Sequence, residues 1–157
     1  MAIVKANFYK QDLNQFAPHR VRGELLDWGM SGLQLEVKIA ASETDTLYAG
    51  DVVTILSTST GKPKVVKGSA TDACVGYILY NPKKEAFKAG DIVTILVREA
   101  VLNCVTEDAI SAGDLVYYKD ADGSVTKTKP TNAQRMGFAM EAVAATDGGT
   151  FISVLVC

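Results

Sequence analysis

Several short motifs in the chain contain residue types that bind phosphate, metal ions or protons. Thr60-Gly61-Lys62 has the glycine and lysine of a nucleotide-binding loop. Such a loop also needs a glycine at its head and a hydroxyl residue directly after the lysine. Leu56 and Pro63 occupy those two places. The motif is therefore interpreted as a turn, and no phosphate site is predicted.

Asp120, Asp122 and Gly123 have the composition of a calcium loop. In that loop the glycine lies at a different position, and a bidentate acidic residue closes it where this chain has Thr131. Asp-Gly is also a preferred tip of a β-hairpin. We therefore predict a hairpin turn here, and we expect no metal and no cofactor.

Acid–base or nucleophilic chemistry has few candidates. His19 is the only histidine, and no nucleophile pattern lies near it. The cysteines Cys74, Cys104 and Cys157 lack metal-ligand spacing and are predicted to be reduced, mostly in the core. A pair of acids facing one cleft is neither shown nor excluded. We predict that the protein is not an enzyme.

Three acids recur at the same place in a repeated phrase. Ala-Gly-Asp precedes an apolar, β-branched run three times, and its glycine and aspartate are predicted to form structural turns. The carboxylates are expected to cap these turns through backbone hydrogen bonds. The turn residues are Gly50 and Asp51, Gly90 and Asp91, and Gly113 and Asp114.

The phrase belongs to a longer repeat, since residues 50–97 can be laid over residues 113–156. Val75-Gly76-Tyr77 then falls on Met136-Gly137-Phe138. Upstream, Leu33–Ile39 alternates apolar and polar residues, which predicts a strand with one buried face. The fold class predicted is all-β: a compact barrel or sandwich-like module built from two related halves, spanning residues 33–157, with an N-terminal extension or arm at 1–32. Each half is too short to bury its own core, so we expect one domain.

The 157 residues are 48% hydrophobic with a net charge of -2 and a pI near 5.4. A nucleic-acid partner is therefore not expected, because the lysines are scattered among acids. The sequence has no run long enough for a membrane span and no signal peptide, so no membrane partner is expected and assembly in a host cytoplasm is predicted.

Residues 1–32 contain the aromatic and arginine types that dominate protein interfaces. We predict contacts with a partner or another subunit from them; the alternative is that the aromatic residues cover one end of the barrel. The predicted contact residues are Phe8, Tyr9, Phe16, His19, Arg20, Arg22 and Trp28.

From Leu33 to Cys157 the chain resembles the capsid decoration, or cement, proteins of tailed bacteriophages. The shared pattern is the Ala-Gly-Asp strand start, a hairpin, Val75-Gly76-Tyr77, a strand leading into Ala100-Val101, and a second hairpin ending in Phe151–Val156. The resemblance implies a virion protein on the capsid exterior that binds the major capsid protein and stabilises contacts between capsomers. It also implies a homo-oligomer, with a trimer favoured.

Two other classes stay open. A carrier-like, barrel-sandwich domain of a cytoplasmic enzyme would carry its modified lysine at a hairpin tip, where Lys62 lies; Pro63 after it departs from the carrier motif. A sugar-binding β-module would expose several aromatic residues on one face. The available ones are Tyr48, Tyr77, Tyr80, Phe87, Tyr117, Tyr118, Phe138 and Phe151.

Overall fold

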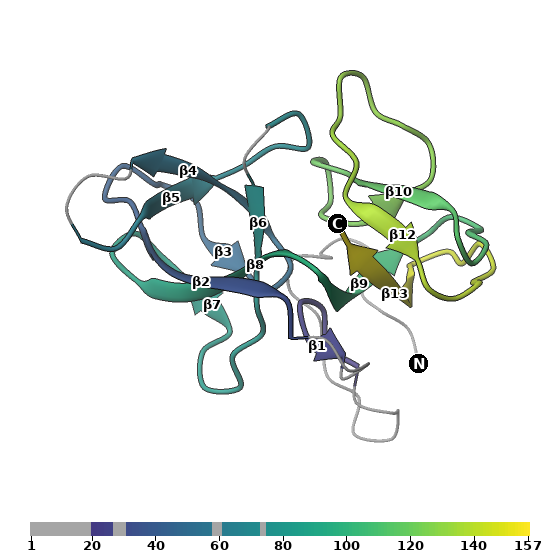
Figure 1. The fold of residues 1–157 in the computed structure, drawn as a ribbon, viewed down its shortest axis with the longest axis horizontal. Coiled ribbons are helices and arrows are strands. Elements are labelled where there is room, and N and C mark those ends of the chain that lie inside the picture. Colours follow the sequence, from purple (N-terminus) through teal and green to yellow (C-terminus); the bar gives the residue numbers. More distant parts are fainter. Residues whose placement is uncertain (1–19, 27–30, 58–60, 73–74) are drawn as a thin grey trace.

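The computed structural model describes residues 20–26, 31–57, 61–72 and 75–157 (Figure 1). In this part of the chain the regular secondary structure consists of thirteen β-strands and no helix, so the all-β prediction is confirmed. The strands are, in chain order, β1 (Leu25–Leu26), β2 (Leu33–Ile39), β3 (Leu47–Tyr48), β4 (Val52–Ser57), β5 (Lys64–Lys67), β6 (Val75–Ile78), β7 (Ala86–Phe87), β8 (Ile92–Arg98), β9 (Ala100–Thr106), β10 (Leu115–Tyr118), β11 (Val125–Thr126), β12 (Gly137–Ala139) and β13 (Thr150–Val156).

The first half of the described chain closes into a barrel with strand order β2-β5-β4-β6-β8. Most neighbours are antiparallel, but the closing pair, β2 and β5, is parallel and short, with Lys38 opposite Lys64 and Ile39 opposite Val65. The short ribbon of β3 and β7 accompanies the barrel. Small β-branched and aliphatic side chains fill its interior, among them Val37, Ile39, Val53, Val65, Ile78, Val93 and Ile95.

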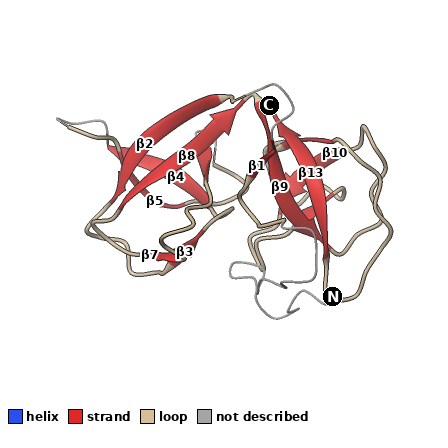
Figure 2. Cartoon of the chain, turned by 90° about the horizontal axis from the view of Figure 1, so that it is seen from below, coloured by secondary structure: helices blue, strands red, loops and turns tan. Residues whose placement is uncertain are grey.

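The second half forms a curled, open sheet with strand order β1-β9-β13-β12-β10-β11. Figures 1 and 2 show this sheet beside the barrel. The two parts share a core, because Val52, Tyr77 and Leu96 of the barrel belong to the same buried cluster as Leu102 and Ile152 of the sheet. The barrel also buries an interior cluster of its own, and the expectation of one domain stays a prediction.

The two sheets have the same strand order and the same register. The glycine of β6, Gly76, lies opposite Val53, and the glycine of β12, Gly137, lies opposite Val116. The equivalent strands are β2 and β9, β4 and β10, β5 and β11, β6 and β12, and β8 and β13. The duplication of residues 50–97 and 113–156 stays a prediction about sequence, and the shared register supports it.

The halves differ in how they close. In the barrel, the backbone N–H of Ala40 donates to the carbonyl of Val65 at 2.8 Å. At the equivalent place in the second half, the side-chain hydroxyl of Thr106 donates to the carbonyl of Val125 at 2.8 Å. The described strands β9 and β11 therefore meet through a side chain without a backbone ladder, and the second sheet stays a half-barrel.

The predicted strand over residues 33–39 is confirmed with the same bounds. Its inner face is buried only at the end that β5 covers. Val37 and Ile39 are fully buried, whereas Leu33 and Leu35 are 42% and 36% exposed.

Candidate functional site

The Ala-Gly-Asp phrases form three turns of the same geometry. In each turn the aspartate accepts a hydrogen bond from the backbone N–H three positions earlier, and its own N–H donates back to that residue's carbonyl. The glycine has a φ of +86°, +89° or +90°, a conformation that side chains disfavour. The contacts run from Tyr48 to Asp51 at 2.8 Å, from Lys88 to Asp91 at 2.8 Å and from Ser111 to Asp114 at 2.9 Å. Each of these carboxylates therefore stabilises the turn to which it belongs.

One of these aspartates also belongs to a buried ion pair. The guanidinium of Arg22 donates to Asp51 at 2.9 Å and to the carbonyl of Ala49 at 2.7 Å. Its other terminal nitrogen donates to the carbonyl of Gly123 at 2.9 Å. Arg22 precedes β1, Asp51 lies in the barrel half and Gly123 in the half-barrel. Arg22 therefore joins the N-terminal segment to both halves.

Burial governs the electrostatics of this pair. Arg22 and Asp51 are each 2% exposed. Burial raises the pKa of the Asp51 carboxyl, and Arg22 offsets part of that rise. Burial also opposes the charge on Arg22, but Tyr118 and Asp51 raise its pKa above the ordinary value, so the guanidinium stays charged. The pair is a structural device in which each charge depends on the other.

Arg22 was predicted to contact a partner, and its burial leaves it no surface to do so in this chain. Arginine is common at protein interfaces, but it is also suited to join two parts of the same chain from the inside. The flanking apolar residues Val21, Leu25 and Leu26 are the signal that favours burial.

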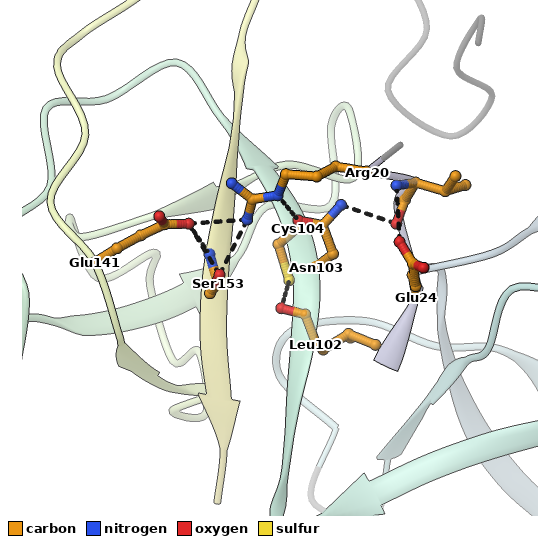
Figure 3. A network of polar contacts seen from close by, with 8 residues as sticks. Arg20, Glu24, Leu102, Asn103, Cys104, Glu141 and Ser153 are labelled. Atoms are coloured by element: carbon orange, nitrogen blue, oxygen red, sulfur yellow. Dashed lines mark hydrogen bonds and ion pairs between the residues drawn. The ribbon is translucent and has the colours of Figure 1, made fainter. Parts of the chain in front are cut away.

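Arg20 occupies a second polar network, on the outer face of the half-barrel (Figure 3). Its guanidinium donates to Asn103 of β9 at 3.0 Å, and to Glu141 and to Ser153 of β13 at 2.8 and 3.0 Å. It also lies over the ring of Phe151, 5.7 Å from the centroid. The described part of the predicted arm, residues 20–26, is thus fixed to the second sheet.

Glu141 and Asn103 complete this network. Partial burial works to raise the pKa of Glu141, but the hydrogen bonds from Arg20 and Ser153 hold it below its ordinary value. Asn103 is fully buried, and its side-chain amide donates to the carbonyl of Val21 at 2.9 Å. Its neighbour Cys104 is also buried, which raises the pKa of that thiol to about 12 and leaves it protonated.

The remaining predicted contact residues, Phe8, Tyr9, Phe16, His19 and Trp28, lie outside the described residues, as does Cys74. Lys62 lies in the connection between β4 and β5, and its ammonium forms an ion pair with Glu36 of β2. Of the aromatic residues considered for a sugar-binding face, Tyr77, Phe87 and Tyr118 are buried in the core. The interpretation of Lys62 as a carrier lysine stays a hypothesis.

Neither a metal-binding cluster nor a membrane-spanning helix is found in the described part of the chain. The described residues hold no cluster of three or more His, Cys, Asp or Glu side chains arranged to bind a metal ion. Nor do they form a helix with the length and apolarity that crossing a membrane requires.

A barrel and a half-barrel share a core and are joined by buried polar contacts, which is the construction of a rigid structural β-module. A family model described as phage cement protein matches residues 30–156. The chain therefore belongs to the phage cement protein family, and it is a structural protein of a phage capsid. The resemblance that the sequence predicted is confirmed at the level of the family.

The fold is also similar to a solved structure, the N base of the head fiber protein gp8.5 of bacteriophage phi29. The TM-score is 0.50 with 12% sequence identity, over 80% of this chain and 93% of that chain. At this identity the likeness concerns the fold. No curated protein matches the sequence.

Proposed function

We propose that the protein binds the outer surface of the assembled capsid and stabilises contacts between neighbouring capsomers. The observation that carries the proposal is the family match over residues 30–156, which includes both the barrel and the half-barrel. The construction suits the task, because two halves joined by a shared core and by the buried Arg22 form a single stiff body. A stiff body that touches two capsomers resists their separation.

The partner in this proposal is the major capsid protein, and the protein acts as a homo-oligomer, with a trimer favoured. An oligomer on a local symmetry axis engages several capsid subunits at once. Each subunit then needs to bury only about 800 Å² against its capsid neighbour, because multivalency supplies the remaining affinity. The expected location is the exterior of the virion.

Part of the contact is proposed to come from the N-terminal residues Phe8, Tyr9, Phe16, His19 and Trp28, whose types are common in interface hot spots. Arg20 keeps part of its side chain exposed and can contribute at the edge of such a contact. Arg22 is not included, since it is buried.

Co-sedimentation with expanded heads that lack the protein tests this function. Saturable binding at a fixed ratio to capsid subunits is expected, and the ratio identifies the symmetry axis. Failure of a folded protein to bind such heads would refute the proposal.

A truncated chain that lacks residues 2–19 tests the arm. This boundary keeps Arg20 and Arg22, whose contacts hold the fold together. We expect the truncated chain to keep the melting temperature of the full chain and to bind heads more weakly. Unchanged binding would assign the contact to the β-module alone.

A further inference from the structure

One edge of the half-barrel is completed by the chain's own N-terminal segment. β1 pairs with β9 in antiparallel register, with Leu25 opposite Leu102. The N–H of Gly23 donates to the carbonyl of Asn103 at 2.8 Å, and the N–H of Asn103 donates to the carbonyl of Glu24 at 2.9 Å. On its other side β9 pairs along its whole length with β13. Both edges of β9 are therefore hydrogen-bonded around Asn103.

The equivalent edge in the barrel belongs to β2. Leu35 of β2 lies opposite Ile95 of β8, as Leu102 of β9 lies opposite Val154 of β13. Glu36 is thus the counterpart of Asn103. The strand that covers β9 at this point is β1, which has no counterpart beside β2 among the described strands.

The backbone of Glu36 faces this uncovered edge. Two residues further along β2, the N–H of Lys38 donates to the carbonyl of Pro63 at 2.9 Å, on the side of β5. Alternate residues of a strand direct their backbone groups to the same edge, so Glu36 and Gln34 also direct theirs to the β5 side. β5 pairs with β2 only at Lys38 and Ile39. No backbone partner for Glu36 is found within the described residues.

The side chains at this edge are exposed in a way that a covered strand would not be. Leu33 and Leu35 are 42% and 36% exposed, and the Glu36 side chain is 55% exposed. An unpaired edge with exposed apolar residues is a template for pairing with another chain.

We propose that the edge of β2 at residues 34–36 receives an extended strand of the capsid subunit, antiparallel to β2, as β9 receives β1. The inference rests on the proposed function. Apolar side chains of the added strand would cover Leu33 and Leu35. Lys38 and Lys64 are exposed beside the edge, which favours an acidic residue in the strand.

A second copy of this chain is a poorer donor of the equivalent segment. Its Gly23–Leu26 segment is held by Asn103 in its own half-barrel. Gly23 also packs so closely on its own barrel half that a Cβ there would lie 2.5 Å from the nitrogen of Gly50. Release of this segment would break those contacts, whereas a capsid strand breaks none of them.

Two substitutions at one position separate backbone pairing from side-chain effects. Glu36→Pro removes the outward N–H, and it spares the ladder with β8 because the Glu36 N–H faces away from that strand. Glu36→Ala keeps the N–H and removes the same carboxylate. Both full-length variants are titrated onto heads that lack the protein, with their melting temperatures measured in parallel. We expect Glu36→Ala to bind within about threefold of the parent and Glu36→Pro to bind about tenfold more weakly or worse.

Hydrogen exchange of the parent protein gives a second readout that needs no variant. The β2 peptide is expected to exchange more slowly on heads than in the free protein, while the β9 peptide around Asn103 is protected in both. Equal binding of the two variants, or unchanged exchange of β2 on heads, would overturn this inference and leave the proposed function standing. A parent protein that does not bind heads would overturn both.

Discussion

Replacement of Arg22 by methionine tests the view that this residue is an internal junction. The variant removes the guanidinium and leaves Asp51 buried without its counterion, and it also takes a donor from the carbonyls of Ala49 and Gly123. Methionine has a similar length, so the cavity contribution is small. Removal of one partner of a buried pair costs about 3–5 kcal/mol. We expect the free energy of unfolding of Arg22→Met to fall by that amount.

The chain contains a matched control in another turn of the same type. Asp91 also holds an Ala-Gly-Asp turn and pairs with Lys84 at 2.8 Å, but this pair is exposed to solvent. Solvent screens such a pair, so its removal costs about 0–1 kcal/mol. The Lys84→Met variant is therefore expected to have nearly the same free energy of unfolding as the parent protein, although the Lys84–Asp91 ion pair is about as short as that of Arg22 and Asp51.

Urea unfolding followed by fluorescence measures both variants, and the slope of the transition checks that the unfolded states are comparable. For a chain of this size the expected loss in Arg22→Met lowers the melting temperature by about 6–20 °C. The double variant Arg22→Met/Asp51→Asn no longer buries an unpaired carboxylate and should recover about 1 kcal/mol or more. Arg22→Met and Lys84→Met variants of equal stability would refute the reasoning.

Three further predictions follow from the geometry of single residues. Gly137→Ala should destabilise the protein by about 2 kcal/mol or more, because a Cβ there would lie 1.9 Å from the carbonyl oxygen of Leu155. Gly76→Ala should cost less, because the atom nearest to its added Cβ, at 2.5 Å, is the end of the flexible Ile95 side chain. Urea unfolding ranks the two variants, and the reverse order would contradict the view that a fixed backbone atom obstructs a Cβ more than the end of a flexible side chain does. The lowered pKa of Glu141 means that its carboxylate stabilises the fold above the unfolded pKa of about 4.3 and loses this effect as the pH falls through the lower folded value. The stability gap between the parent and Glu141→Gln should therefore narrow from about pH 7 to about pH 3, and a gap that is constant with pH would contradict the role of the charge. The thiol of Cys104, with its pKa raised to about 12 by burial, should resist maleimide in the native protein and react in guanidinium, as peptide mass spectrometry after digestion can show; rapid native labelling would contradict its burial.

The turns and strands could be predicted from the sequence because their causes are local. A turn with a glycine at positive φ and an aspartate that caps it requires only four neighbouring residues. The alternation of apolar and polar residues in β2 is likewise visible within the strand itself. The shared register of β6 and β12 follows from the order of such local signals. These features need no knowledge of distant contacts.

The closure of the two sheets could not be predicted in the same way. In the barrel, closure depends on backbone pairing between β2 and β5. In the second half, the side chain of Thr106 makes the contact between the equivalent strands β9 and β11. The fate of Arg22 also depends on residues far along the chain, since its partners are Asp51 and Gly123. An arginine in an aromatic-rich segment has the same local pattern whether it faces a partner or the interior.

The predicted duplication offers an explanation for the open edge in the barrel. β9 pairs with β13 along one edge, which leaves its other edge to be covered. β1 covers that edge, and β1 precedes the first half in the sequence. Between the halves the chain passes directly from Arg98 to Ala100 through Glu99, whose φ is +67°. The connection therefore contains no residues that could form a second covering strand. Of these two equivalent edges, only that of β9 is covered among the described strands, and the proposed capsid strand beside β2 would repeat with a partner what β1 does within the chain.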